Sequence, residues 1–137
     1  MAYFQGILPI MKKYISTGPG LPVLTAPISH AVVANDTCYV SGQLSVGLDG
    51  SYVCAAIEEE AERSFNNMFA VLRAAQFSPE DLVFIDIAFA DLGDLPKVNE
   101  VVAALFAADA RPARTIYQAA ALPYGAKIKV MGVAVRS

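Results

Sequence analysis

The sequence predicts an α+β domain in two layers, a mixed and mostly antiparallel sheet with two helices on one face. Three observations lead to this fold class. Short runs of β-forming residues are bounded by turn-forming residues, and two longer segments repeat apolar residues at helical spacing. The order along the chain is strand, strand, strand, helix, strand, helix, strand, strand. Elements in this order pack as a sheet with one covered face.

The first half of the chain supplies three of the predicted strands. A β-prone piece at 12–16 precedes a loop at 18–22, where glycines and prolines exclude both a helix and a central strand. Residues 29–34 and 38–45 are predicted to form a hairpin. The Asn-Asp pair between them tolerates the positive φ that a two-residue turn requires.

The first predicted helix spans 57–75 and has one apolar stripe. Its first turns contain Glu58, Glu59 and Glu60. We expect this cluster to face water at the positive end of the helix macrodipole rather than to form an acid/base site. The second helix is predicted over 94–108, with Asp94 as its N-cap.

Between the helices, residues 82–90 predict an apolar strand that is buried on both faces. Asp86 lies in its middle. An isolated carboxylate is costly in such a strand, so we expect Asp86 to pair with an arginine or lysine more often than to act chemically.

The end of the chain, residues 111–135, predicts a second β-hairpin. Its first part is rich in β-formers, Leu-Pro-Tyr-Gly at 122–125 has turn chemistry, and 127–135 alternates in the manner of a strand. Arg114 lies at the start of the first strand. Its guanidinium either closes a structural ion pair or donates two parallel hydrogen bonds to the carboxylate of a small ligand. Residue type alone favours the ion pair.

Length and composition indicate a single domain that associates with copies of itself. We take residues 11–137 as this domain and residues 1–10 as a tag remnant or disordered extension, because Tyr-Phe-Gln-Gly at 3–6 resembles a protease tag. Apolar residues make up 55% of the 137 residues and charged residues 17%. Apolar surface therefore remains once the core is filled, and the uncovered face of the sheet is expected to meet another subunit.

Charge and cysteine content exclude several classes of function. The formal net charge is −3, and no basic cluster extends beyond Lys12 and Lys13, so nucleic-acid binding is not expected. The apolar run at 101–108 is far shorter than the roughly 18 residues that cross a membrane. One histidine and two cysteines without metal-ligand spacing predict no metal site and no disulfide. Cys38 and Cys54 are interpreted as small buried residues of a cytoplasmic protein.

Several motifs together resemble the RidA/YjgF family of reactive enamine/imine deaminases. They are Arg-Pro-Ala-Arg-Thr at 111–115 with the following Leu-Pro and Lys-Ile-Lys-Val, Ala-Pro-Ile-Ser-His-Ala-Val at 26–32, and Tyr-Val-Ser-Gly-Gln-Leu at 39–44. The resemblance implies a chorismate-mutase-like α+β domain assembled as a homotrimer with pockets between subunits. It also implies hydrolysis of 2-aminoacrylate-type enamines, or their imine tautomers, to 2-keto acids and ammonia without metal or organic cofactor.

The resemblance also assigns the site. Arg114 matches the catalytic residue that binds the substrate carboxylate. The resemblance places six further positions near the substrate: Ile28, Ser41, Gly42, Asn99, Thr115 and Lys129.

Two of these positions depart from the family pattern. Ile28 replaces an aromatic hydroxyl, for which Tyr117 and Tyr124 are candidate substitutes. Lys129 replaces a glutamate that positions water, and together with Arg114 it is expected to favour a ligand with two acidic groups.

Two other functions stay open on the sequence. One is a non-catalytic trimer that binds small carboxylates or partner proteins. The other is an endoribonuclease, an activity also ascribed to the family. It ranks last because an acid/base pair is needed, and the chain offers only His30, an acidic net charge and no phosphate-binding cluster.

Overall fold

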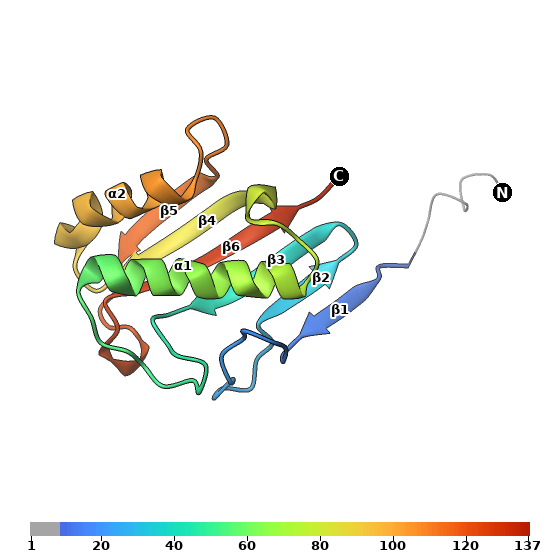
Figure 1. Ribbon diagram of the computed structural model, residues 1–137, viewed down its shortest axis with the longest axis horizontal. Coiled ribbons are helices and arrows are strands. Elements are labelled where there is room, and N and C mark those ends of the chain that lie inside the picture. Colours follow the sequence, from blue (N-terminus) through green and yellow to red (C-terminus); the bar gives the residue numbers. More distant parts are fainter. Residues whose placement is uncertain (1–8) are drawn as a thin grey trace.

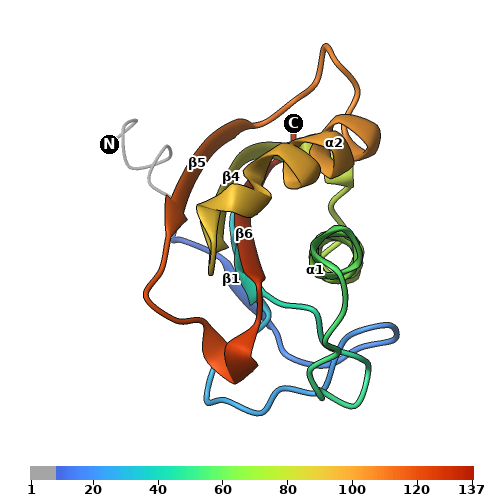
Figure 2. The same ribbon diagram turned by 90° about the vertical axis from the view of Figure 1, so that its left-hand side faces the viewer.

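A six-stranded sheet carries both helices on one of its faces (Figures 1 and 2). The computed structural model describes residues 9–137, so most of the predicted extension at 1–10 lies outside it. The helices are α1 (Ile57–Ala74) and α2 (Leu95–Leu105). The strands are β1 (Lys12–Ile15), β2 (Ala31–Ala34), β3 (Thr37–Gln43), β4 (Leu82–Phe89), β5 (Ala113–Gln118) and β6 (Ile128–Val135). The predicted α+β class and the order of elements are confirmed.

The first predicted hairpin is confirmed and the second is wrong. β2 and β3 pair antiparallel across a turn in which Asn35 has φ 54°. The strand order is β1-β2-β3-β6-β4-β5, so β4 lies between β5 and β6. β4 runs parallel to β5 and antiparallel to β6. Because β4 is the most apolar strand, placing it between two neighbours buries it better than an edge position would. The turn chemistry at 122–125 forms a 3₁₀ turn, η4 (Pro123–Gly125).

The core lies between the helices and the sheet. The apolar stripe of α1 is buried as predicted, with Phe65, Met68 and Leu72 fully inaccessible to solvent. Phe106 packs edge-on against Phe65 and Phe69, with ring centroids 6.0 and 5.8 Å apart. The backbone is extended at Phe106, and α2 ends at Leu105, earlier than predicted.

The predicted cap of the second helix is correct in position but not in chemistry. Asp94 occupies the N-cap of α2, yet its side chain makes no capping hydrogen bond. The carboxylate of Asp91 instead accepts a hydrogen bond from the backbone N–H of Gly93 at 2.8 Å, which caps the preceding 3₁₀ turn, η3 (Leu92–Asp94).

A row of apolar side chains crosses the face of the sheet that no helix covers. The pairing register aligns these residues on five neighbouring strands: Tyr14, Val32, Tyr39, Val133 and Phe84. Tyr14 is 62% exposed and Tyr39 is 54% exposed, whereas the other three are half-buried. Part of the exposed apolar surface therefore lies on the uncovered face, as expected from composition, while Val23, Leu48 and Leu92 are exposed outside the strands.

Asp86 lies on the same uncovered face, and the prediction that it pairs with a cation is wrong. Its carboxylate accepts a hydrogen bond from the hydroxyl of Thr115 on β5, which is its partner in the register. The strand is not buried on both faces, so Asp86 keeps contact with solvent and needs no counter-ion.

Within residues 9–137, no helix is both long and apolar enough to cross a membrane.

Gly132 of β6 packs tightly against both α1 and the neighbouring strand β4. A Cβ atom there would lie 2.8 Å from Cδ2 of Leu82, 3.2 Å from Sδ of Met68 and 3.2 Å from the backbone oxygen of Phe84. We expect Gly132→Ala to lower the free energy of unfolding by about 1–3 kcal/mol through overpacking, as measured by urea denaturation. Gly47→Ala is the control, because its Cβ would make only an ordinary contact. Equal loss in both variants would contradict the interpretation.

Candidate functional site

Arg114 lies on edge strand β5, on the side of the sheet that faces the helices. It pairs with buried Ile85 of β4, and its Nη1 donates a hydrogen bond to Oδ1 of Asn99 on α2 at 2.7 Å. The ion pairs within residues 9–137 are Lys127 with Glu60 and Arg136 with Asp36. In that part of the chain Arg114 therefore has no acidic partner, and the ion-pair interpretation is not what the structure shows.

A cavity of about 320 Å³ lies beside Arg114, between α2 and β5. We call it the arginine cavity. It is lined by Ile85, Asn99, Val102, Ala103, Arg111, Pro112 and Arg114. Its walls are thus partly apolar, and its polar side chains are two guanidinium groups and one amide.

Three of the other predicted site residues line a different cavity, of about 330 Å³. We call it the lysine cavity. Ile28, Gly42 and Lys129 line it, together with Tyr124 and the buried His30. A Cβ at Gly42 would lie only 2.8 Å from Cδ of Lys129, so the glycine leaves room for the lysine stem to cross β3.

The side chains around the lysine cavity are held by hydrogen bonds. Nε2 of His30 lies 2.7 Å from the backbone oxygen of Pro22, and the hydroxyls of Tyr124 and Thr25 are 2.9 Å apart. The hydroxyl of Ser41 donates to the backbone oxygen of Ser29 at 2.6 Å. The side chain of Lys129 has no hydrogen-bond or ion-pair partner among the residues that the structure describes.

Within one chain, six of the seven predicted site residues lie in three places, whereas Ser41 lines neither cavity. Arg114 and Asn99 line the arginine cavity, Ile28, Gly42 and Lys129 line the lysine cavity, and Thr115 contacts Asp86 on the uncovered face. Tyr117 is exposed on that face as well, whereas Tyr124 lines the lysine cavity.

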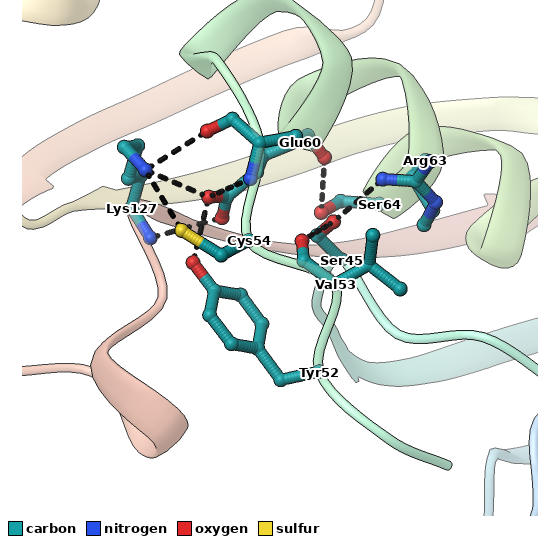
Figure 3. A network of polar contacts seen from close by, with 9 residues as sticks. Ser45, Tyr52, Val53, Cys54, Glu60, Arg63, Ser64 and Lys127 are labelled. Carbon is teal, nitrogen blue, oxygen red and sulfur yellow. Dashed lines mark hydrogen bonds and ion pairs between the residues drawn. The ribbon is translucent and has the colours of Figure 1, made fainter. Parts of the chain in front are cut away.

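The sequence analysis missed a polar network around Glu60 (Figure 3). The prediction that the Glu58-Glu59-Glu60 cluster faces water is wrong for Glu60, whose side chain is completely buried. Its carboxylate accepts hydrogen bonds from the Tyr52 hydroxyl at 2.6 Å and from the backbone N–H groups of Ala55 and Lys127 at 3.3 and 3.1 Å. Nζ of Lys127 lies 3.1 Å from the same carboxylate. Helical spacing carried a signal, because Glu60 follows buried Ile57 by three residues and precedes buried Ser64 by four.

The network shifts the protonation of all three of its ionisable groups. Burial by itself raises the pKa of Glu60, but the hydrogen bonds from Tyr52, Lys127 and Ala55 outweigh it and keep the pKa below its ordinary value. The hydrogen bond to Glu60 raises the pKa of Lys127. Burial, followed by the bond to Glu60, raises the pKa of Tyr52. At neutral pH the network is thus an anionic carboxylate with a cationic lysine and a neutral phenol.

This network positions the lysine cavity rather than lining it. It fixes Lys127, two residues before Lys129, against the first turn of α1. It also holds Tyr52, whose ring stacks on Tyr124 at a centroid distance of 6.4 Å. Glu60 thus connects α1 to the start of β6 and, through Tyr52, to one wall of the cavity.

The two cysteines differ in their surroundings. Cys38 is buried as predicted, and burial raises its pKa to about 11. Cys54 is exposed, contrary to the prediction, because it lies in the loop before α1, with its Sγ 3.6 Å from Nζ of Lys127. Across residues 9–137, the His, Cys, Asp and Glu side chains form no group of three that could hold a metal ion.

Comparison with known proteins gives consistent matches over nearly the whole chain. The family model described as Endoribonuclease L-PSP matches residues 21–136. A mouse protein named 2-iminobutanoate/2-iminopropanoate deaminase is 37% identical over 130 residues, which cover 93% of each chain.

Solved structures agree with these matches. The YjgF gene product of E. coli superposes with a TM-score of 0.83 at 29% identity, covering 91% of this chain and 99% of that one. E. coli TdcF with bound serine has a TM-score of 0.82 at 29% identity, over 91% of this chain and all of the other. Motifs, fold and length thus agree, and the chain belongs to the RidA/YjgF family, which the Endoribonuclease L-PSP model describes.

Proposed function

We propose that this protein hydrolyses reactive enamine and imine intermediates of the 2-aminoacrylate type to 2-keto acids and ammonia. The observation that carries the proposal is the guanidinium of Arg114, which is held by Asn99 beside a cavity and has no acidic partner within residues 9–137. The name of the mouse relative describes this class of reaction. The bound serine of TdcF is likewise a small molecule with a carboxylate.

In this mechanism, Arg114 holds the substrate carboxylate through two parallel hydrogen bonds. The enamine first becomes an imine when a proton leaves nitrogen and adds to the terminal carbon. Water then adds to the imine carbon, the C–N bond breaks, and one 2-keto acid and one ammonia leave. Such a fork contributes on the order of 1.5–3 kcal/mol of binding. That is sufficient to select carboxylates and to orient an imine that also hydrolyses unaided.

The complete pocket is proposed to form between chains of a homotrimer. Two observations support this arrangement. The site residues of one chain are divided between two cavities, and the uncovered face of the sheet carries the row of five apolar side chains that begins with Tyr14 on β1 and ends with Phe84 on β4. Burying that row against a second chain stabilises the assembly by the hydrophobic effect. Arg114, Asn99 and Thr115 of one chain then share a pocket with Ile28, Ser41, Gly42 and Lys129 of its neighbour.

Sedimentation velocity at micromolar concentration is expected to give the mass of three chains. Tyr39→Lys places a charge in the middle of the apolar row and is expected to shift the population toward species smaller than a trimer. A wild-type protein that sediments as one chain at all concentrations would overturn this arrangement.

Keto-acid release from freshly generated 2-aminoacrylate tests the activity. Wild-type protein is expected to accelerate release above the spontaneous rate without added metal or organic cofactor. A second candidate is a trimer that binds small carboxylates without hydrolysis, favoured by Lys129, since a cation cannot accept a proton from water as the family's glutamate does. Binding of 2-keto acids with no acceleration of release would support that alternative.

The endoribonuclease candidate has less support from the site. His30 lines the lysine cavity but is 3% exposed, and both ring nitrogens already have protein partners, the backbone oxygen of Pro22 at 2.7 Å and the Gln43 amide nitrogen at 3.4 Å. Together with the deaminase function, we propose that the protein is located in the cytoplasm and does not bind nucleic acid.

A further inference from the structure

The arginine cavity contains more positive charge than one carboxylate requires. Arg111 lines it together with Arg114, and no aspartate or glutamate is among its lining residues. The chain has 13 acidic and 10 basic residues, so acidic groups are plentiful elsewhere. Two like charges at one cavity repel each other and are tolerated because both side chains remain exposed. An anion bound between the two guanidinium groups would be attracted to both of them, and these attractions would offset the repulsion.

The donor groups at this cavity are largely unused. An arginine has five N–H donors, and Arg114 gives one of them to Asn99. Arg111 has no side-chain hydrogen bond within residues 9–137. Since the amide oxygen of Asn99 is taken by Arg114, its NH₂ group is left as a further donor.

The backbone holds the two arginines in a defined relation. Pro112 fixes its own φ and restricts Arg111 before it to extended conformations. Arg114 is fixed by its place in β5 and by the bond to Asn99. The two cations are therefore presented by a stiff segment, which lowers the entropy lost when a ligand bridges them.

We propose that Arg111 is a specificity-determining residue and that the preferred substrate carries a second acidic group, as in the imine of a 2-keto dicarboxylic acid. This inference rests on the proposed function, because Arg114 is taken as the anchor for the first carboxylate. A volume of about 320 Å³ suits a metabolite-sized acid, at the lower end of the roughly 300–1,000 Å³ typical of small-molecule sites. The sequence assigned the second cationic contact to Lys129, but within one chain Lys129 lines the other cavity, and Arg111 is the second cation beside Arg114. The Arg111 variants therefore test Arg111 separately from Lys129 of a neighbouring chain.

Titration calorimetry with two acids of equal chain length tests the proposal. The probes are 2-oxopentanoate, with one carboxylate, and 2-oxopentanedioate, with two. Wild-type protein is expected to bind the diacid at least about tenfold more tightly, as one additional charge-assisted hydrogen-bonded contact provides. Arg111→Gln should abolish most of this preference by weakening the diacid much more than the monoacid, and Arg111→Lys should restore part of it.

Lys97→Gln is the matched control. It removes one positive charge from α2, on an exposed side chain that does not line the arginine cavity, so the preference should be retained. The proposal is overturned if wild type binds both acids equally or does not bind the diacid. It is also overturned if Arg111→Gln weakens both acids by the same factor, or if Lys97→Gln removes the preference as fully.

The kinetic assay separates failure of this inference from failure of the proposed function. If imines of monocarboxylates are hydrolysed in an Arg114-dependent manner while calorimetry shows no diacid preference, only the inference fails. If calorimetry shows the Arg111-dependent preference while no imine is hydrolysed, the proposed function fails and the second anion contact stands.

Discussion

Replacing Arg114 by alanine is expected to lower kcat/KM for imine hydrolysis roughly 10- to 150-fold. This range follows from losing a charge-assisted fork of about 1.5–3 kcal/mol. The carboxylate is remote from the bond that breaks, and its contact with Arg114 is the same in the bound substrate and the transition state. Most of the loss should therefore be a rise in KM, with a smaller fall in kcat from poorer positioning of the imine carbon.

Keto-acid release from imine generated in situ measures both parameters. Arg114→Lys should be intermediate, because it keeps the charge and loses the planar fork. Arg73→Ala is the matched control, an exposed arginine in the last turn of α1 that lines none of the described cavities. Unchanged kinetics in Arg114→Ala, or an equal loss in Arg73→Ala, would remove Arg114 from the site.

Glu60→Ala is expected to lower the free energy of unfolding by about 2–4 kcal/mol. The substitution leaves the Tyr52 hydroxyl and two backbone N–H groups without their acceptor and takes the counter-ion from Lys127. The value lies below that of a fully buried pair because the Lys127 side chain is 38% exposed and is partly solvated. Glu62→Ala, an exposed position on the same helix, should change stability by no more than about 0.5 kcal/mol.

Urea denaturation at neutral pH measures these differences, and the pH dependence provides an independent check. The pKa of Glu60 in the folded state is lower than its ordinary value of 4.5. Its stabilisation is thus fully present above that value and is lost as pH falls through the folded-state pKa. The difference in unfolding free energy between wild type and Glu60→Gln should shrink steadily below pH 4.5. A difference that stays constant down to pH 3 would show that the charge of Glu60 does not contribute.

If Glu60 positions the lysine cavity, substituting Glu60 should change the wall of that cavity as well as the stability of the fold. The start of β6 and the Tyr52 ring against Tyr124 both depend on it. A substitution on α1 then alters the wall that Lys129 shares with Tyr124, although Glu60 itself touches no part of that cavity.

The sequence by itself determined the features that depend on near neighbours along the chain. The apolar stripe of α1 follows from three- and four-residue spacing, and the β2–β3 hairpin follows from a two-residue turn between two β-forming runs. The motifs taken together, including the one around Arg114, also identified the family. These signals are local, and tertiary contacts reinforce them rather than compete with them.

Only the tertiary structure decided which distant segments meet. Turn chemistry at 122–125 is compatible with a hairpin, but burial of β4 placed that strand between β5 and β6. The spacing of Glu60 within α1 indicated its face, yet nothing local showed that Lys127, far along the chain, would supply its counter-ion. Likewise, Arg111 and Arg114 line one cavity, whereas Lys129 lines the other. Pairing across a sheet and packing of a helix on it depend on total buried area, which no short window of sequence contains.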